Sequence, residues 1–533
     1  MKLSRFRPGR AALAFGAGLL AALAHPPFSI WPGLFGWALL LAVLDWPSGP
    51  GGRWRAFGAG WLAGFGYFVV SCWWVAEAFF VDAAHQAWMA PFAVLILPAG
   101  LGLFWGAATL VYRLLAPSGV SRVLVFAALM SITEWLRGHV LTGFPWDLPG
   151  ETWRAGSAPS QAASLVGAYG LSFLTLAAMA AFGPLLTAGN RKYRTGAALA
   201  GSVLLAALWI GGTVRLMAPA PPATPLRVRI VQPDVPQESK WSAGLLADIA
   251  RRYANLTSGP GPGRDPDVIV WPEGALPASL QDETDAKGWL QPIIAHALRP
   301  GQILLMGTYR AQPQRHGPAL YFNSLTAVRR AGDGLTVLGD YDKYRLVPFG
   351  EYLPMEPVLG ALGVKDWAHV GDGFSPGPRP QPVAFAGLPL AQPLICYEAL
   401  YPGLAISGKR RAAWIVTVSN DAWFARSTGP LRRFQSGPLQ HVNQAAYRAI
   451  EQGLPMIRAT PTGVSAAIDA FGRTLKGARL GPGESGVIDV DLPGPAPRTL
   501  YSRIGDLGFL LLVLLGLAFA RRGPGLARTT QRT

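Results

Sequence analysis

The sequence contains few charged residues and only two cysteines. Of its 533 residues 14% are charged, compared with roughly 25% in an ordinary soluble domain, whereas 50% are apolar. A deficit of charge of this size is typical of a membrane protein. Two cysteines in so long a chain, Cys72 and Cys396, exclude a disulfide framework and any zinc site that needs several thiolates.

The charge that is present is mostly positive, with a formal net charge of +17. A basic chain can bind nucleic acid, but many of these basic residues lie in short clusters beside apolar runs. The sequence has no long basic stripe and no RNA- or DNA-binding motif. We therefore expect the lipid bilayer, and no nucleic acid, as a partner.

Eight apolar runs are candidates for membrane-spanning helices, because a bilayer core of about 30 Å needs roughly 20 mostly apolar residues in a helix. Seven of the runs begin near Ala11, Trp31, Phe57, Ala87, Val123, Ala162 and Thr195, and the eighth ends at Ala520. We expect a seven-helix transmembrane region over residues 1–215 and a C-terminal transmembrane helix over 503–520. The stretch between them, 226–493, has no spanning run and is expected to be a separate domain.

The first run also has features of a cleavable signal peptide, with a basic start and the small residues "ALA" after the apolar stretch. We expect it to be retained, because the following runs form a multi-pass bundle that needs no removable signal.

Basic residues near the run ends predict the orientation. With eight spans they all fall on one side of the membrane: Lys2, Arg5, Arg7, Arg10, Arg53, Arg55, Arg113, Arg122, Arg191, Lys192, Arg194, Arg521, Arg522 and Arg528. The opposite loops "HPPFSIWPG" and "EAFFVDAAHQAW" contain no Lys or Arg. Since Lys and Arg concentrate on the cytoplasmic side, both termini are expected there. The large domain then faces the periplasm from a bacterial inner membrane.

One outward loop departs from this charge pattern. The segment "EWLRGHVLTGFPWDLPGETWR" contains Arg137 and Arg154 among several aromatic residues. These residues can form an interfacial aromatic belt. Alternatively, an arginine beside a lipid-facing site can hold a phosphate.

The large domain alternates β-rich runs with amphipathic helical patterns, which favours an α/β layered domain. Strands are expected within residues 226–233, 266–273, 302–310, 321–330, 388–398 and 412–421, and helices within 243–257 and 439–453.

Cys396, in "PLICYEALYP", is the cysteine whose role has to be explained. An oxidising compartment favours disulfides, but Cys72 belongs to the third apolar run and is a poor partner. A buried core thiol therefore remains one interpretation. A nucleophile is the other, and it requires a base or a positive neighbour, since a free thiol has a pKa of about 8.5.

Three predicted strand ends carry complementary groups. Glu273 follows a strand that ends in "VIVWPE", Lys343 follows "LTVLGDYD", and Cys396 follows "LPLAQPLI". Sites in α/β sheets gather where strands end. Glu273 as general base, Lys343 as a donor to an oxyanion and Cys396 as nucleophile form a chemically coherent set. Each residue alone also fits a structural role, Glu273 in a turn and Lys343 on the surface.

A Cys–His protease is the rival arrangement, with His441 or His369 as base. Nothing around Cys396 matches a protease motif, and a packing or capping role suits His441 on its helix.

Together, "WPEGALP", "YDKYRLVPFGEYLP", "ICYEALYP" and "VSNDAWFARSTGP" resemble the motifs of the nitrilase superfamily, whose catalytic set is Glu–Lys–Cys. Combined with eight apolar runs, they resemble bacterial apolipoprotein N-acyltransferases over nearly the whole chain. Further similar segments are "GFPW", Lys240–Trp241 and "RATPTGVSAAID". The resemblance implies an αββα sandwich for the large domain beside a helical membrane bundle.

The resemblance assigns catalysis to Glu273, Lys343 and Cys396. It also implies supporting roles for Glu351, Tyr397, Glu398, Trp241, Trp423, Trp146 and Arg137. The sequence departs from the family pattern at Tyr344 and Arg345, where His-type residues are expected, and at Ala425, where glycine is usual.

The function implied by the resemblance is acyl transfer from a membrane phospholipid, through a thioester on Cys396, to the N-terminal amine of an apolipoprotein. It implies no metal or organic cofactor, and we expect a monomer. One alternative is a membrane-tethered nitrilase-type amidohydrolase. The other is a transporter with an outward binding domain, although the predicted spans offer few charges beyond Glu77 and Glu134.

Overall fold

The computed structural model describes residues 8–46, 52–119, 121–240, 243–276, 288–332, 334–361, 373–406, 410–425 and 434–518. The chain divides into two compact units. The first comprises Met1–Trp73, Pro91–Arg215 and Ile504–Thr533, and the second comprises Trp74–Ala90 and Leu216–Arg503. The segment Trp74–Ala90, which lies inside the expected transmembrane region, therefore groups with the large domain. One reason is the contact of the Trp74 and Phe424 rings, whose centroids are 4.9 Å apart.

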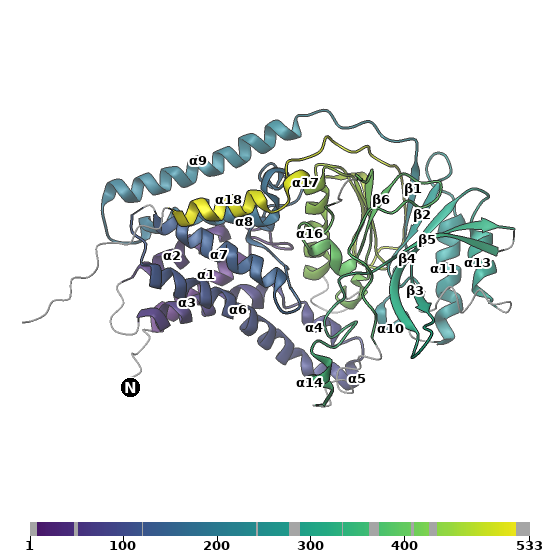
Figure 1. The fold of residues 1–533 in the computed structure, drawn as a ribbon, viewed down its shortest axis with the longest axis horizontal. Helices are drawn as coiled ribbons and strands as arrows, with labels where there is room; N and C mark the ends of the chain where they lie inside the picture. The colour runs from purple at the N-terminus through teal and green to yellow at the C-terminus, as the bar shows by residue number, and fades with distance from the viewer. Residues whose placement is uncertain are drawn as a thin grey trace, which may run out of the picture. The chain divides into compact units, whose positions relative to one another are not determined.

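The first unit is helical, and each of the eight predicted runs contains a helix (Figure 1). The helices are α1 Pro8–Ala22, α2 Gly36–Asp45, α3 Gly52–Ser71, α6 Ala90–Leu115, α7 Ser121–His139, α8 Ala163–Ala180, α9 Arg191–Leu216 and α18 Leu507–Ala518. Within the described residues, three helical segments are long and apolar enough to cross a membrane: Ala83–Leu115, Pro159–Leu186 and Arg191–Leu216. Gly9–Ala22, Trp31–Asp45 and Leu507–Ala518 are shorter apolar helices, and the end of the eighth run lies outside the described residues.

Small residues let the helices of this unit approach closely, as is usual for helices packed in a membrane. A Cβ atom at Gly18 of α1 would lie 1.8 Å from the carbonyl oxygen of Ala63 on α3. Glycine is therefore required at this crossing, and a larger side chain would separate the two helices.

The second unit contains two β-sheets, with strand orders β11-β1-β2-β3-β4-β5 and β10-β9-β8-β7-β6. The strands of the first sheet are β1 Arg227–Gln232, β2 Val268–Trp271, β3 Ile303–Gln312, β4 Leu320–Ala331, β5 Gly334–Asp342 and β11 Gly486–Asp491. Those of the second sheet are β6 Ala391–Ile395, β7 Trp414–Val418, β8 Met456–Ala459, β9 Ser465–Ile468 and β10 Thr474–Leu480. All six strands expected from the sequence are present.

Each sheet has a parallel part, formed by β1, β2 and β3 in one and by β6, β7 and β8 at one end of the other. Parallel neighbours require crossover connections. The helices α11 (Leu246–Ser258) and α13 (Leu290–Ala297) lie on the crossovers of the first sheet, and α16 (Ser436–Gln452) connects β7 to β8. These parallel strands are rich in apolar residues because both of their faces are largely buried.

The sheets face each other, and helices cover their outer sides, which gives four layers in the order helix, sheet, sheet, helix (Figure 1). Val270 and Leu305 of the first sheet share one core cluster with Ile395 and Val416 of the second. A second cluster joins α11 and α13 to the outer face of the first sheet. The expected helices at 243–257 and 439–453 correspond to α11 and α16.

Candidate active site

The carboxyl ends of four strands meet at one place in the second unit. Glu273 follows β2, Lys343 follows β5, Cys396 follows β6 and Asn420 follows β7. Two of these strands belong to each sheet. The site is thus built across the two facing sheets, where strand ends leave polar groups accessible.

A close approach of two backbones fixes the position of Glu273. A Cβ atom at Gly307, on the neighbouring strand β3, would lie 2.5 Å from the Glu273 Cα atom. It would also lie 2.5 Å from the carbonyl oxygen of Pro272. Only glycine allows the chain after β2 to pass this close to β3. Gly307 therefore fixes the position of the Glu273 backbone.

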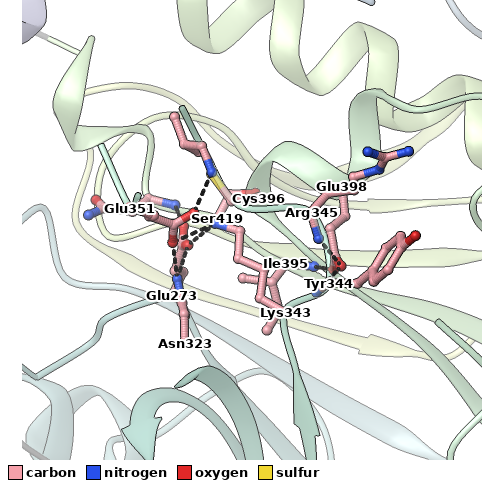
Figure 2. Close-up of polar contacts among 12 residues, drawn as sticks. Glu273, Asn323, Lys343, Tyr344, Arg345, Glu351, Ile395, Cys396, Glu398 and Ser419 are labelled. Atoms are coloured by element: carbon pink, nitrogen blue, oxygen red, sulfur yellow. Dashed lines mark hydrogen bonds and ion pairs between the residues drawn. The ribbon is translucent and has the colours of Figure 1, made fainter. Parts of the chain in front are cut away.

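Lys343 is paired with two carboxylates. Its Nζ atom donates to Oε1 of Glu273 at 2.8 Å and to Oε1 of Glu351 at 3.0 Å (Figure 2). The Lys343 side chain is only 1% exposed, and those of Glu273 and Glu351 are 8% and 11% exposed. The Cys396 thiol is also hydrogen-bonded to the Glu273 carboxylate. The structure therefore brings together the three residues that the sequence proposed for catalysis, with Glu351 beside them.

The surroundings set the protonation of this group. Burial acts to raise the pKa of Glu273, but the charge and hydrogen bond of Lys343 outweigh it and leave the pKa below its usual value. Burial also acts to lower the pKa of Lys343, and Glu273 and Glu351 together raise it well above normal. Burial and the Glu273 charge raise the pKa of the Cys396 thiol well above its usual value. The site therefore contains a neutral thiol that is hydrogen-bonded to an ionised carboxylate.

Cys396 is partly exposed as a residue, although protein atoms surround its sulfur closely enough to desolvate it. It is free, as is Cys72. Its backbone has φ +51°, a left-handed conformation that costs a non-glycine residue of the order of 1–3 kcal/mol. This conformation turns the chain at the end of a buried strand. Contacts from neighbouring residues have to stabilise the strained backbone of Cys396.

Glu398 provides one of these restraints. Its carboxylate is fully buried and accepts hydrogen bonds from the backbone N–H of Ile395 at 2.7 Å and of Tyr344 at 2.8 Å. The Tyr341 hydroxyl donates to both carboxylate oxygens, at 2.9 and 3.0 Å. Glu398 therefore ties the turn before Cys396 to the turn after Lys343, on the far side of the lysine from Glu273 (Figure 2).

A buried polar network provides the second restraint. His441, on α16, contacts Asp421 with Nδ1 at 2.9 Å and the carbonyl oxygen of Cys396 with Nε2 at 3.2 Å. Arg458, in β8, donates to both oxygens of Asp421 at 2.9 Å and to Ser419 Oγ at 2.8 Å. Both His441 ring nitrogens are engaged by other groups, so the histidine is not the base of a Cys–His pair. His369, the other candidate, lies outside the described residues.

A family model of the apolipoprotein N-acyltransferase N-terminal domain matches residues 17–181, and one of carbon-nitrogen hydrolases matches 227–496. An apolipoprotein N-acyltransferase of Caulobacter vibrioides is 50% identical over 511 residues, which cover 96% of this chain and 94% of that protein. The chain belongs to the apolipoprotein N-acyltransferase family. This confirms the resemblance inferred from the sequence motifs.

Two further relatives with the same name agree with this assignment. The apolipoprotein N-acyltransferase of Rhodopseudomonas palustris is 38% identical over 534 residues, 97% of this chain and 96% of the relative. That of Bradyrhizobium diazoefficiens is 39% identical over 528 residues, 96% of this chain and 95% of the relative. The similarity thus extends through the helical unit and the sheet domain alike, and a transporter with an appended binding domain is not supported.

The supporting residues expected in this acyltransferase-family chain have different surroundings. Tyr397 is buried, and its ring lies 5.3 Å from that of Tyr401. Trp423 is 41% exposed at the end of a short turn that follows Asp421. Trp241 lies outside the described residues. Among these three aromatic residues, the structure therefore describes Tyr397, next to Cys396 in the chain, and Trp423, which is exposed.

Arg137 and Trp146 belong to the first unit, where both are buried. The Arg137 guanidinium forms an ion pair with Glu134 and lies 4.9 Å from the centroid of the Phe68 ring. The burial of Arg137 and Trp146 does not fit an exposed aromatic belt. Arg154 is exposed and remains compatible with one.

Two residues of the site, Asn323 and Lys240, were given no role from the sequence. Asn323, inside β4, donates through Nδ2 to Oε1 of Glu273 and Oε1 of Glu351, both at 2.7 Å. A polar residue at a buried position of the apolar strand "YFNSLTAV" was the available signal. Lys240 reaches the site from another element and is considered further below. Among the described residues, no cluster of His, Cys, Asp and Glu is suited to a metal ion.

The departures from the family pattern leave the Glu–Lys–Cys cluster undisturbed. The Arg345 guanidinium lies 5.4 Å from the Tyr344 ring centroid and 5.0 Å from that of Tyr401. Its backbone N–H donates to Glu398 at 3.3 Å. Ala425 is buried. The residues that differ therefore form an aromatic and cationic wall next to the Glu398 turn.

Proposed function

We propose that this protein transfers a fatty acyl chain from a membrane phospholipid to the α-amino group of diacylglyceryl-cysteine at the N-terminus of an apolipoprotein. The transfer passes through a thioester on Cys396, with Glu273 as general base and Lys343 as the stabilising cation. Family membership supports the overall reaction. The observation that carries the mechanism is the hydrogen bond of the Cys396 thiol to a Glu273 carboxylate that is ion-paired with Lys343.

In the first half-reaction the sulfur attacks the ester carbonyl carbon while Glu273 takes the thiol proton. The raised pKa of Cys396 and the lowered pKa of Glu273 require this transfer to accompany the attack. The Lys343 ammonium and the Asn420 N–H are nearby donors for the negative oxygen of the tetrahedral intermediate. The C–O bond then breaks, Glu273 returns the proton to the leaving hydroxyl, and a lysophospholipid departs.

In the second half-reaction the neutral amine of the acceptor attacks the thioester carbonyl. Glu273 accepts a proton from the amine, the C–S bond breaks, and the proton returns to the Cys396 sulfur. The product is an amide, and the free thiol is restored. A thioester suits this sequence because it stores the acyl group in a form that an amine can take. The two half-reactions imply ping-pong kinetics and no cofactor.

The membrane arrangement belongs to the same proposal. The eight helices in the predicted runs cross the inner membrane, both termini are cytoplasmic, and the domain of residues 226–493 faces the periplasm. In this arrangement residues 1–215 and 503–520 form the transmembrane part, and the enzyme acts as a monomer. The exposed Trp423 suits contact with a lipid substrate, because an indole ring combines an apolar body with a polar tip.

Intact-mass analysis combined with a labelled-lipid assay tests the reaction. The purified full-length protein is incubated with an acyl-labelled phospholipid, first alone and then with a diacylglyceryl-cysteine lipopeptide. We expect an acyl-sized adduct on Cys396 that hydroxylamine removes, followed by label in an amide of the lipopeptide. Cys396→Ala abolishes both products, whereas Cys72→Ala, which removes the other free cysteine, retains them.

Two outcomes would contradict the proposal. Full activity of the Cys396→Ala variant would exclude a thioester on this residue. Labelled free fatty acid without any labelled lipopeptide would show that water resolves the thioester, as in a nitrilase-type hydrolase.

A further inference from the structure

A second buried lysine lies beside the reacting pair. Lys240 ends the short helix α10 (Gln237–Lys240) and is 3% exposed. Its Nζ atom donates to the carbonyl oxygen of Gly274 at 3.1 Å and to Oδ1 of Asn420 at 3.2 Å. No ion pair of Lys240 occurs among the residues that the structure describes. A buried ammonium without a direct carboxylate partner is costly, so its presence calls for an explanation.

The two acceptors of Lys240 flank the reacting groups. Gly274 directly follows Glu273 in the chain. The Asn420 backbone N–H donates to Oε2 of Glu273 at 2.8 Å and is also hydrogen-bonded to the Cys396 sulfur. The Asn420 side chain is held between Lys240 and Oε1 of Gln237, to which it donates at 2.9 Å. Lys240 therefore restrains the segment whose N–H touches both the base and the nucleophile.

The charges of the cluster give Lys240 an electrostatic role as well. Glu273 and Glu351 carry two negative charges, and Lys343 carries one positive charge, which leaves one negative charge uncompensated. Excess negative charge beside Cys396 opposes formation of the thiolate. The ammonium of Lys240 is close enough to interact with both Glu273 and Cys396. With it, two carboxylates face two ammonium groups, and the proton transfer from thiol to carboxylate leaves that balance unchanged.

We propose that Lys240 is a positioning residue that places a second positive charge beside Glu273 and Cys396 and holds the Asn420 N–H against both of them. It thereby makes the thiol more reactive without touching the substrate. Burial lowers the pKa of Lys240 to about 8, although Glu273 and Cys396 act to raise it, so the lysine is still mostly protonated at neutral pH. The inference rests on Cys396 being the nucleophile of the proposed function.

The test measures the reactivity of the thiol itself. The full-length protein carries Cys72→Ala, so that Cys396 is its single cysteine, and the rate of its alkylation by iodoacetamide is followed from pH 6 to 10. Lys240→Met keeps the apolar stem and removes the charge, and Lys240→Gln also keeps an N–H donor. We expect both variants to react about tenfold more slowly at pH 7.5, with the profile displaced upward by about one pH unit. Lys240→Arg is expected to keep most of the reactivity, and Lys476→Gln, on the exposed side of β10, to keep all of it.

Each outcome decides the proposal. If Lys240→Met does not fold, Lys240→Gln carries the same comparison, with thermal unfolding as a check on both variants. A folded variant with the alkylation rate and pH profile of the parent would overturn the proposal and leave Lys240 a purely structural residue. Because alkylation requires no lipid, a protein that showed the expected profile but no acyl transfer would contradict the proposed function and not this inference.

Discussion

Glu398 is a buried carboxylate on which two opposing effects act. Complete burial favours the neutral form, whereas donors from Ile395, Tyr344 and Tyr341 favour the ionised form. Burial is the larger effect and raises the pKa of Glu398 to about 7 from its ordinary value of 4.5. Replacement by Gln removes the titration and puts an NH2 group opposite one of the backbone N–H donors.

The contribution of Glu398 to the free energy of unfolding depends on pH, and its size follows from the linkage between protonation and folding. A difference of about 2.5 pH units corresponds to about 3 kcal/mol, at about 1.4 kcal/mol for each unit. Since the pKa is higher in the folded state, this stabilisation is fully present below pH 4.5 and is lost as the pH rises through about 7. The Glu398→Gln side chain is neutral at every pH, so the variant does not undergo this pH-dependent loss, whereas its unpaired N–H costs about 1–3 kcal/mol at every pH.

The assay is thermal unfolding of the purified protein and of Glu398→Gln between pH 5 and pH 8. We expect the variant to be less stable at pH 5, with a gap in Tm that narrows toward pH 8 and closes or reverses there. If each kcal/mol shifts Tm by about 2 °C, the narrowing is about 6 °C. Glu484→Gln, which removes an exposed carboxylate, serves as the control and is expected to show no such narrowing. A gap that stays constant or widens as the pH rises would refute the reasoning, because the donors would then outweigh burial and keep Glu398 ionised throughout.

Three further changes test the site. Lys343→Met leaves Glu273 and a second buried carboxylate without their cation, so we expect Glu273 to take up a proton and the acyl-enzyme adduct to disappear from intact-mass spectra; an undiminished adduct would contradict the assigned pairing. Gly307→Ala places a methyl group against the Glu273 backbone and should lower kcat with a loss of about 1–3 kcal/mol in stability, measured by kinetics and thermal unfolding; unchanged kcat would show that the approach is not needed. Arg458→Met leaves the buried carboxylate of Asp421 without its bidentate partner, and we expect about 3–5 kcal/mol of destabilisation in denaturant unfolding, which a change within error would exclude.

The strands and the residues at their ends could be predicted because their signals are local. Short β-rich segments marked β2, β5 and β6, and the ends of these segments placed Glu273, Lys343 and Cys396. Membership of the family was predictable for a related reason, since its motifs are short and surround these same residues. The two facing sheets were expected only from the family resemblance, and the order of the strands within each sheet was not predicted.

The remaining contacts could not be predicted because they join positions far apart in the chain. Asn323 and Glu273 are separated by 50 residues, and Lys240 and Asn420 by 180. The first pairing depends on the order of strands within one sheet, and the second depends on the packing of the two sheets against each other. No local pattern encodes either arrangement. The grouping of Trp74–Ala90 with the sheet domain is a further example, because its hydropathy alone indicates a loop between two spans.

The groups of the site are divided between the two sheets, so the distances between these groups depend on how the sheets pack against each other. Glu273 and Lys343 move with one sheet, and Cys396 and Asn420 move with the other. A shift of about an ångström between the sheets would separate the Glu273 carboxylate from the Cys396 sulfur while each sheet kept its own hydrogen bonds. Residues of the shared core, such as Trp414 and Val416, therefore affect the chemistry from a distance. Substitutions in this core should therefore lower kcat at temperatures at which the protein is still folded.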